Sequence, residues 1–124
     1  LIPNDRTFQR DVFVRDRAEG RVQRVSDAPG LDEADGPSRN ARISGDGRTV
    51  VFESAAANLL AGDTNNRWDV YLVDLATRET ERVSLSSVGQ QVAQDALDPA
   101  LSDAGRRVAF HSSSASLVPQ DQNQ

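Results

Sequence analysis

The segment from Asp63 to Asp69 has the residue types from which a cation site could be built. Its sequence is Asp-Thr-Asn-Asn-Arg-Trp-Asp, and similar acidic spacings occur towards both ends of the chain, at Asp5 with Asp11 and at Asp121 with Asn123. Calcium usually takes about six to eight oxygen ligands, and dedicated loops close with a bidentate Glu that this segment lacks. The alternative is that Asp63 and Asn65 shape a turn through hydrogen bonds to the backbone. We therefore predict no cofactor and no metal site, with calcium at Asp63 to Asp69 as the alternative.

Two other groups of side chains have types that could support catalysis. Carboxylates gather from Asp27 to Asp35, but the Pro and Gly residues around them predict an exposed loop, where pKa values stay near normal. His111 is the one histidine and is predicted at an outward or edge position of a strand. The serines from Ser112 to Ser116 form a polar run, and no Gly-x-Ser-x-Gly elbow occurs. We predict no catalytic residue, and a chain that is not an enzyme.

Trp68 is the only tryptophan and stands beside the polar segment. A lone aromatic residue in such a place can be a contact hot spot for a protein or can stack on a sugar. Packing beneath its own loop is the more common arrangement. We predict that packing for Trp68.

Composition excludes several classes of function. The net charge is -5, and all 14 basic residues are Arg, scattered from Arg6 to Arg107. A phosphate backbone would be repelled by this mean field, so we predict no nucleic-acid partner. The absence of cysteine excludes disulfides and thiolate catalysis. No stretch approaches the roughly 18 apolar residues of a membrane span, and a start without Met suggests a processed form or a cut piece.

The second part of the chain repeats the first at a constant offset, in which position 69 corresponds to position 11. The segment from Asp11 to Asp16, Asp-Val-Phe-Val-Arg-Asp, aligns without a gap with Asp-Val-Tyr-Leu-Val-Asp from Asp69 to Asp74. Four further anchors share the same offset: Arg24-Val-Ser with Arg82-Val-Ser, Ile43-Ser with Leu101-Ser, Gly47-Arg with Gly105-Arg, and Val50-x-Phe-x-Ser with Val108-x-Phe-x-Ser. We predict one segment containing a first repeat at 1–58, a second at 59–116 and the start of a third at 117–124.

Each repeat is predicted to contain four short strands, which in the first copy are 11–16, 22–26, 41–44 and 49–54. Gly20 and the Gly45-Asp46-Gly47 run are suited to the hairpin turns between them. In the second copy Arg78 replaces Gly20, and Asp103-Ala104-Gly105 replaces the other run. We expect those two turns to be longer or reshaped.

The middle strands are apolar on both faces, since Val70 and Leu72 oppose Tyr71 and Val73 along one strand. An antiparallel sheet with one wet face would alternate polar and apolar residues instead. Four-stranded sheets stacked between similar sheets around an axis would need this pattern, and they form a β-propeller. The predicted fold class is therefore all-β, with β-propeller blades and about two blades' worth of chain. A two-sheet sandwich is the alternative.

The most extended motif runs from Ala41 to Ser54, Ala-Arg-Ile-Ser-Gly-Asp-Gly-Arg-Thr-Val-Val-Phe-Glu-Ser, and recurs from Pro99 to Ser112. It resembles the TolB-like propeller repeat, a relative of the WD-repeat family, although Ala41 replaces the usual Pro and Ala104 the usual Asp. The resemblance implies a chain that starts in mid-blade. It would supply an outer half-blade, one whole blade from about Ala41 to Leu85 and an inner half-blade. It also implies a periplasmic or extracellular location.

Two arrangements could complete the blades. The chain could be a section of a longer array, or copies could form a ring in which the inner half of one pairs with the outer half of the next. In such a ring, Leu117 to Gln124 would compete for the place of Leu1 to Phe8, which favours a section of a longer array. The predicted function is non-enzymatic protein or peptide binding, or scaffolding. The alternatives are a propeller that accompanies a hydrolase, and a sugar-binding propeller that uses Trp68.

Overall fold

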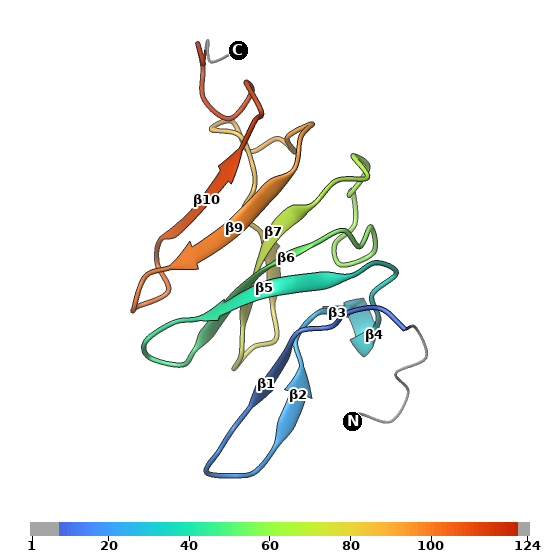
Figure 1. Ribbon diagram of the computed structural model, residues 1–124, viewed down its shortest axis with the longest axis vertical. Coiled ribbons are helices and arrows are strands. Elements are labelled where there is room, and N and C mark those ends of the chain that lie inside the picture. The colour runs from blue at the N-terminus through green and yellow to red at the C-terminus, as the bar shows by residue number, and fades with distance from the viewer. Residues whose placement is uncertain (1–7, 122–124) are drawn as a thin grey trace.

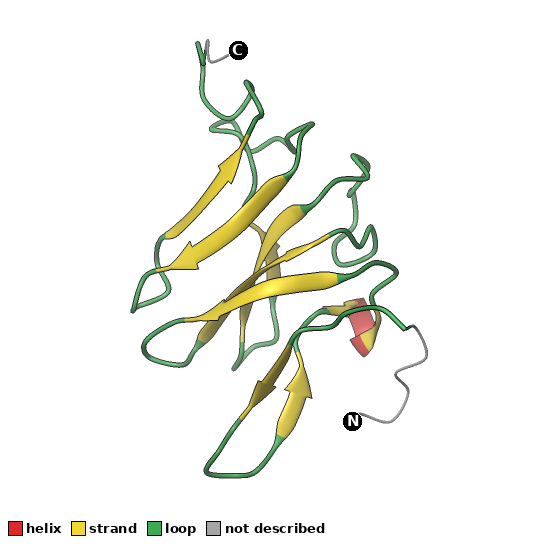
Figure 2. Cartoon of the chain, in the orientation of Figure 1, coloured by secondary structure: helices red, strands yellow, loops and turns green. Residues whose placement is uncertain are grey.

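The protein is all-β in the computed structural model, which describes residues 8–121. One helical turn, η1 (Pro29–Leu31), interrupts the strands (Figure 2). The strands are β1 (Phe13–Arg15), β2 (Val22–Arg24), β3 (Asp27–Ala28), β4 (Asp32–Glu33), β5 (Ser38–Ile43), β6 (Thr49–Ser54), β7 (Asp69–Asp74), β8 (Thr80–Arg82), β9 (Ala96–Leu101) and β10 (Val108–Ser112). The all-β prediction is confirmed.

The strands form four antiparallel sheets, of which β5-β6-β7-β8 has four strands and the others two. We call β5–β8 the middle sheet, β1–β2 the N-terminal hairpin and β9–β10 the C-terminal hairpin; β3 and β4 form a small separate pair. Figure 1 shows the two hairpins towards opposite ends of the long axis, with the middle sheet between them. The middle sheet thus has a neighbour on either side.

The two central strands of the middle sheet, β6 and β7, are buried on both faces, as their apolar pattern predicts. On one face Val50, Phe52 and Tyr71 form a core with Val12 and Val25 of the N-terminal segment. On the other face, Val51 and Val70 pack with Ala96, and three residues of the C-terminal hairpin cover them, namely Leu101, Val108 and Phe110. The Phe52 and Tyr71 rings stack with centroids 6.1 Å apart. Burial of both faces is what allows β6 and β7 to have apolar side chains on both sides of the sheet.

Equivalent positions of the two repeats make the same buried contacts. Ser84 donates a hydrogen bond from its hydroxyl to Asp69 at 2.7 Å and accepts one from the backbone N–H of Val70 at 3.0 Å. The equivalent set, Ser26, Asp11 and Val12, has distances of 2.8 Å and 3.1 Å. Both serines are fully buried. Each serine lies two residues after a strand and therefore ties the end of that strand to the start of the strand before it.

A β-bulge interrupts the β5–β6 pair and the β9–β10 pair at matching positions. Asn40 in β5 and Asp98 in β9 each have a φ of 53°, and the strand register shifts beside both. Pro99, which follows Asp98, lacks the N–H that a regular ladder would use, so a bulge is a place where it is tolerated. Ala41 occupies the matching position in β5, and the bulge is present there without proline.

The expectation that the second-copy turns are longer or reshaped is wrong. Arg78 has a φ of 65°, close to the 70° of Gly20. Gly105 has a φ of 69° against 70° for Gly47, and each donates its N–H to the serine three residues earlier. In the turns that contain Gly20 and Arg78, a carboxylate accepts turn N–H groups and holds both turns in the same shape. Arg78 is therefore forced into the left-handed region.

Some strand limits also differ from those expected. β1 and β2 are shorter than 11–16 and 22–26, whereas β5 begins three residues before Ala41. The four-stranded sheet runs from Ser38 to Arg82. The short elements β3, η1 and β4 lie in a segment that the sequence predicts as a plain exposed loop.

Asp74 caps the β7–β8 turn and should make the protein sensitive to acid. Its Oδ1 accepts the N–H groups of Thr77 and Ala76 at 3.0 Å and 2.8 Å, which lowers its pKa below the ordinary 3.8. A carboxyl group with a lowered folded-state pKa contributes stability above its unfolded pKa and loses it as the pH falls through the folded value. Asp74→Asn should therefore flatten the decline of the melting temperature below about pH 5. A decline as steep as that of the wild type would contradict this role.

Gly105 and Gly47 offer a matched pair for testing the contact between the C-terminal hairpin and the middle sheet. Both have positive φ, but a Cβ at Gly47 would meet nothing within 4 Å, whereas one at Gly105 would collide with Thr49 Oγ1. Gly105→Ala should lower the free energy of unfolding by about 1–3 kcal/mol more than Gly47→Ala, because both carry the backbone strain but only one overpacks.

Urea unfolding measures this difference. Adding Thr49→Ala to Gly105→Ala should recover part of the loss, because it removes the hydroxyl that the new methyl group meets. Equal losses for Gly47→Ala and Gly105→Ala would show that the turn does not lie against Thr49.

Candidate functional site

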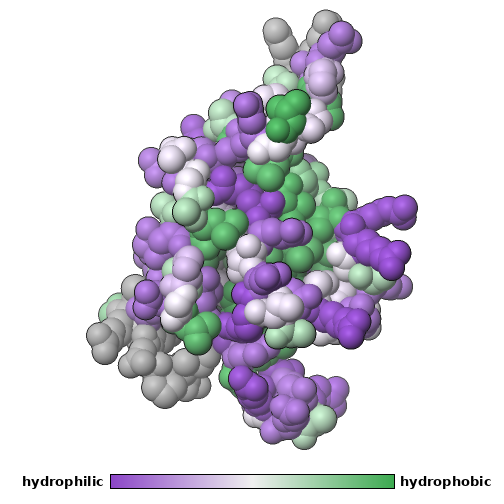
Figure 3. All heavy atoms as spheres, turned by 180° about the vertical axis from the view of Figure 1, so that it is seen from behind, coloured by the Kyte–Doolittle hydropathy of each residue, from purple (hydrophilic) through white to green (hydrophobic). Residues whose placement is uncertain are grey.

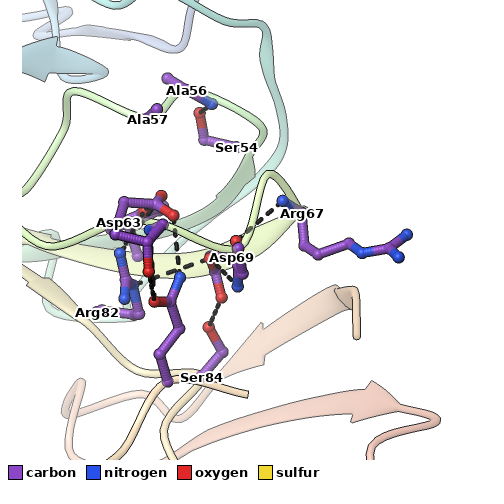
Figure 4. Close-up of polar contacts among 12 residues, drawn as sticks. Ser54, Ala56, Ala57, Asp63, Arg67, Asp69, Arg82 and Ser84 are labelled. Carbon is purple, nitrogen blue, oxygen red and sulfur yellow. Dashed lines mark hydrogen bonds and ion pairs between the residues drawn. The ribbon is translucent and has the colours of Figure 1, made fainter. Parts of the chain in front are cut away.

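A polar cluster occupies the end of the middle sheet from which the loops 55–68 and 83–95 leave. Arg82 lies at its centre, with its guanidinium 3.3 Å from Asp63 and 3.9 Å from Asp69 and 5.7 Å from the Tyr71 ring centroid. Tyr71 donates its hydroxyl to Asp63 at 2.7 Å. In Figure 4, Asp63, Asp69, Arg82 and Ser84 point towards one another, whereas Arg67 extends away. The buried carboxylates and the guanidinium hold the two loops to the sheet.

Burial governs the protonation of this cluster. It raises the pKa of Asp69, against the opposing effects of the hydrogen bonds from Ser84 and Asn65 and of the charge on Arg82. The pKa of Tyr71 is raised as well, first by burial and then by its hydrogen bond to Asp63. Burial acts to lower the pKa of Arg82, but its contacts with Tyr71 and the carboxylates raise it overall. The cluster therefore keeps a charged guanidinium and a neutral phenol.

The oxygens proposed for calcium are already occupied by protein donors. Asp63 Oδ1 accepts from Gln91 and Oδ2 from Tyr71, while Asp69 Oδ1 accepts from Ser84 and Oδ2 from Asn65. No group of three or more His, Asp or Glu side chains in residues 8–121 is arranged to hold a metal ion. Asp5 and Asn123, which have the related spacings, lie outside the described residues. A calcium ion at Asp63 and Asp69 would have to displace Arg82.

We expect neither calcium nor a chelator to change the melting temperature of the wild-type protein, because Arg82 supplies the positive charge between the two carboxylates. Differential scanning fluorimetry with millimolar calcium and with EGTA tests this expectation. A ligand that binds only the folded state raises the melting temperature with its concentration. A rise that saturates with calcium would instead establish the site at Asp63 to Asp69.

Trp68 belongs to a second, more exposed group of side chains at the same end of the sheet. The Arg39 guanidinium from β5 lies 4.1 Å from the centroid of the Trp68 ring, and the backbone N–H of Trp68 donates to Asp95. Trp68 is half-buried. The sequence predicts packing beneath its own loop and does not foresee a stack on Arg39, which belongs to a strand well before Trp68 in the chain.

Glu53 joins this group to the C-terminal hairpin. Its carboxylate is fully buried and accepts from Arg39 at 2.6 Å, from Asn40 at 2.7 Å and from the backbone N–H of Asp98 at 2.8 Å. Asp98 in turn contacts His111 Nε2 at 2.8 Å. A continuous chain of contacts thus crosses from the middle sheet to β10. We call the half-buried Trp68 and the exposed residues of this group the Trp68 surface: Arg39, Asn40, Trp68, Asp98 and His111.

His111 lies at an exposed position, as the sequence predicts. Its side chain is 64% exposed and that of Asp98 is 69% exposed. Asp98 is the side-chain partner that the structure gives His111 within residues 8–121, and no serine of that range is hydrogen-bonded to the ring. An exposed His–Asp pair without an oriented serine does not form the relay of a serine hydrolase.

Asp32 and Asp35 are exposed, as predicted for this segment, whereas Asp27 is largely buried among structural partners, which corrects the prediction there. Asp27 binds Arg24 at 2.6 Å and Arg78 at 2.7 Å, and its side chain is only 11% exposed. Asp35 accepts the N–H of Ala57 at 2.7 Å. The sequence gives little sign of these contacts, because Arg78 comes from the turn after β7, 51 residues later.

Residues 8–121 contain no helix long and apolar enough to cross a membrane. A comparison of the chain with protein-family models, with curated proteins and with solved structures finds no match.

Proposed function

We propose that this chain is a propeller-type segment that binds a protein or peptide through the Trp68 surface, and that it is not an enzyme. The observation that carries the proposal is the middle sheet, which is covered on both faces by segments of the same strand pattern. Rigid stacked sheets of this kind present variable loops at their ends, where recognition tolerates sequence change. The resemblance to TolB-like repeats and a periplasmic or extracellular location belong to the same proposal.

The chemistry of the Trp68 surface suits a polypeptide ligand. Trp and Arg are enriched among residues that dominate protein interfaces, and here they are stacked together. Asn40 and Asp98 add an amide and a carboxylate on bulged backbone, beside the exposed imidazole of His111. An aromatic ring among donors and acceptors of both charges can contact apolar side chains and backbone groups together.

The sugar-binding and hydrolase alternatives gain less support. Arg39 lies over the Trp68 ring, on a face that a sugar would need for stacking. A hydrolase would need an activated nucleophile, and His111 has an exposed Asp as its partner instead.

Selection of displayed random peptides on the immobilised chain tests the proposal. Enriched peptides should bind the wild type and should lose about tenfold or more in affinity with Trp68→Ala or Arg39→Ala, as expected for interface hot spots. Val88→Ala serves as the control, because Val88 is 73% exposed and lies outside the Trp68 surface. Failure to enrich any peptide, or binding that is unchanged by Trp68→Ala and Arg39→Ala, would overturn the assignment.

A further inference from the structure

Two strand edges in the structure lack the neighbours that their counterparts have. β10 pairs with β9 and β1 pairs with β2, and the opposite edge of each pairs with no strand of residues 8–121. β6 is the counterpart of β10 in the first repeat, and it pairs along its whole length with β7, the counterpart of β1. The C-terminal hairpin thus corresponds to the β5–β6 half of the middle sheet, and the N-terminal hairpin corresponds to its β7–β8 half. Unpaired edges of this kind are templates for further strand pairing.

We propose that a second copy of this chain, rather than the longer array that the repeat register favours, completes the C-terminal hairpin, with β1 of one copy pairing antiparallel to β10 of the other. The middle sheet supplies the register, because Phe52 lies opposite Tyr71 and Val51 opposite Leu72. β10 takes the place of β6 in this register, and β1 takes the place of β7. Phe110 then lies opposite Phe13, Ala109 opposite Val14 and Arg107 opposite Asp16. This proposal rests on the same stacked-sheet architecture as the proposed function.

The surfaces that would meet are exposed and apolar at their centres. Phe13 and Val22 are 43% and 41% exposed, and the pairing of β1 with β2 places them on one face of the N-terminal hairpin. Val14, on the opposite face, packs on the middle sheet. The face with Phe13 is therefore the one left open to solvent, and exposed apolar residues also interrupt the polar surface on the rear of the molecule (Figure 3).

A groove of about 530 Å³ lies over β7 and β8 on the middle sheet, and Leu72 and Glu81 line it. Leu72 shares a face with Val70, which packs with Phe110. The groove thus opens on the side of the middle sheet that holds β10. A hairpin added to β10 in the proposed register would cover it, as the N-terminal hairpin covers the opposite face.

The N-terminal hairpin and the groove over β7 and β8 have complementary charges. The groove includes Asp74, Glu79 and Glu81, and residues 69–82 have four acidic side chains against two Arg. Residues 13–24 expose three Arg against two acidic side chains, in a chain whose net charge is -5. Opposite patches of this kind orient partners and weaken with salt. A second copy would therefore be attracted in the proposed orientation.

Such pairing is head-to-tail, because β1 and β10 are different surfaces, so it closes into a ring or continues as a filament. Each copy contributes two sheets' worth of strands. Since propellers usually have about four to eight blades, a closed ring would contain about two to four copies.

Sedimentation velocity across a range of protein and salt concentrations tests the proposal. We expect species heavier than 13.5 kDa that dissociate as salt rises, and at least about tenfold weaker association for Phe13→Glu. Phe8→Glu is the matched control, because Phe8 is fully exposed and lies outside β1. Circular dichroism should show both variants folded, since each side chain is exposed in the monomer.

A monomer at every concentration would overturn the inference, as would oligomers that Phe13→Glu leaves intact. Peptide binding through Trp68 is measured separately on the same samples. A chain that binds peptide as a monomer would refute self-pairing alone, and one that assembles without binding peptide would refute the proposed function alone.

Discussion

Phe52→Ala is expected to lower the free energy of unfolding by about 3–5 kcal/mol, the usual cost of removing a fully buried phenylalanine from a core. Phe52 is fully buried in β6, stacks on Tyr71 and contributes to the core between the middle sheet and the N-terminal segment. The loss comes from transfer of the ring to water and from the cavity that rigid strands cannot close. Urea or thermal unfolding measures it.

Phe110→Ala is the matched control, because Phe110 occupies the equivalent position of the second repeat, in β10, but is only partly buried. Its loss should be clearly smaller than that of Phe52→Ala in the monomer. Phe52→Leu keeps most of the apolar volume, and its smaller loss can be measured if the alanine variant does not fold. Equal losses at the two phenylalanines would contradict the view that the middle sheet alone is covered on both faces.

The features that the sequence predicts well are those that depend on local pattern. The limits of β6, Thr49–Ser54, are those expected from the apolar residues Val50 to Phe52 and the Gly-containing turn before them. The apolar character of both faces of β7 predicts a sheet with two neighbours, which the structure confirms. These predictions succeed because strand periodicity and burial leave a direct trace in residue type.

The features that the sequence misses depend on contacts between distant segments. The turn at Arg78 keeps the conformation of the turn at Gly20, because Asp74 accepts the turn N–H groups and Asp27 binds the Arg78 guanidinium. Together these contacts offset the strain of a positive φ in a residue with a Cβ. Propensity alone therefore favours a different turn, and tertiary contacts override it.

The candidate site divides in the same way. The sequence singles out Asp63, Asp69 and Trp68 by type, but Arg82 and Arg39 become relevant only when the strands pair. Arg82 lies opposite Tyr71 across β7 and β8, and Arg39 lies opposite Glu53 across β5 and β6. Aligning the two copies could have suggested Arg82, since Arg24 occupies the matching position and binds buried carboxylates as well.

Arg82→Ala is expected to destabilise the protein by about 3–5 kcal/mol at neutral pH, as expected when one partner of a buried ion cluster is removed. Arg82 is 8% exposed, and the side chains of Asp63 and Asp69 are 3% and 0% exposed. Without the guanidinium these carboxylates remain close together without a positive charge, and Tyr71 loses its cation–π partner. Arg67→Ala is the control, because the Arg67 side chain extends away from the cluster (Figure 4).

The pH dependence of this loss separates charge from packing. Burial already raises the pKa of Asp69, and Arg82 opposes that rise, so the variant should raise the pKa further. A carboxyl group with a raised folded-state pKa favours the folded state in acid, and that contribution is lost as the pH rises through the folded value. Unfolding measured from about pH 4 to pH 7 should therefore show a deficit that grows with pH. A deficit independent of pH would mean that Arg82 acts through its packing on Tyr71, because the loss of an apolar stem does not titrate.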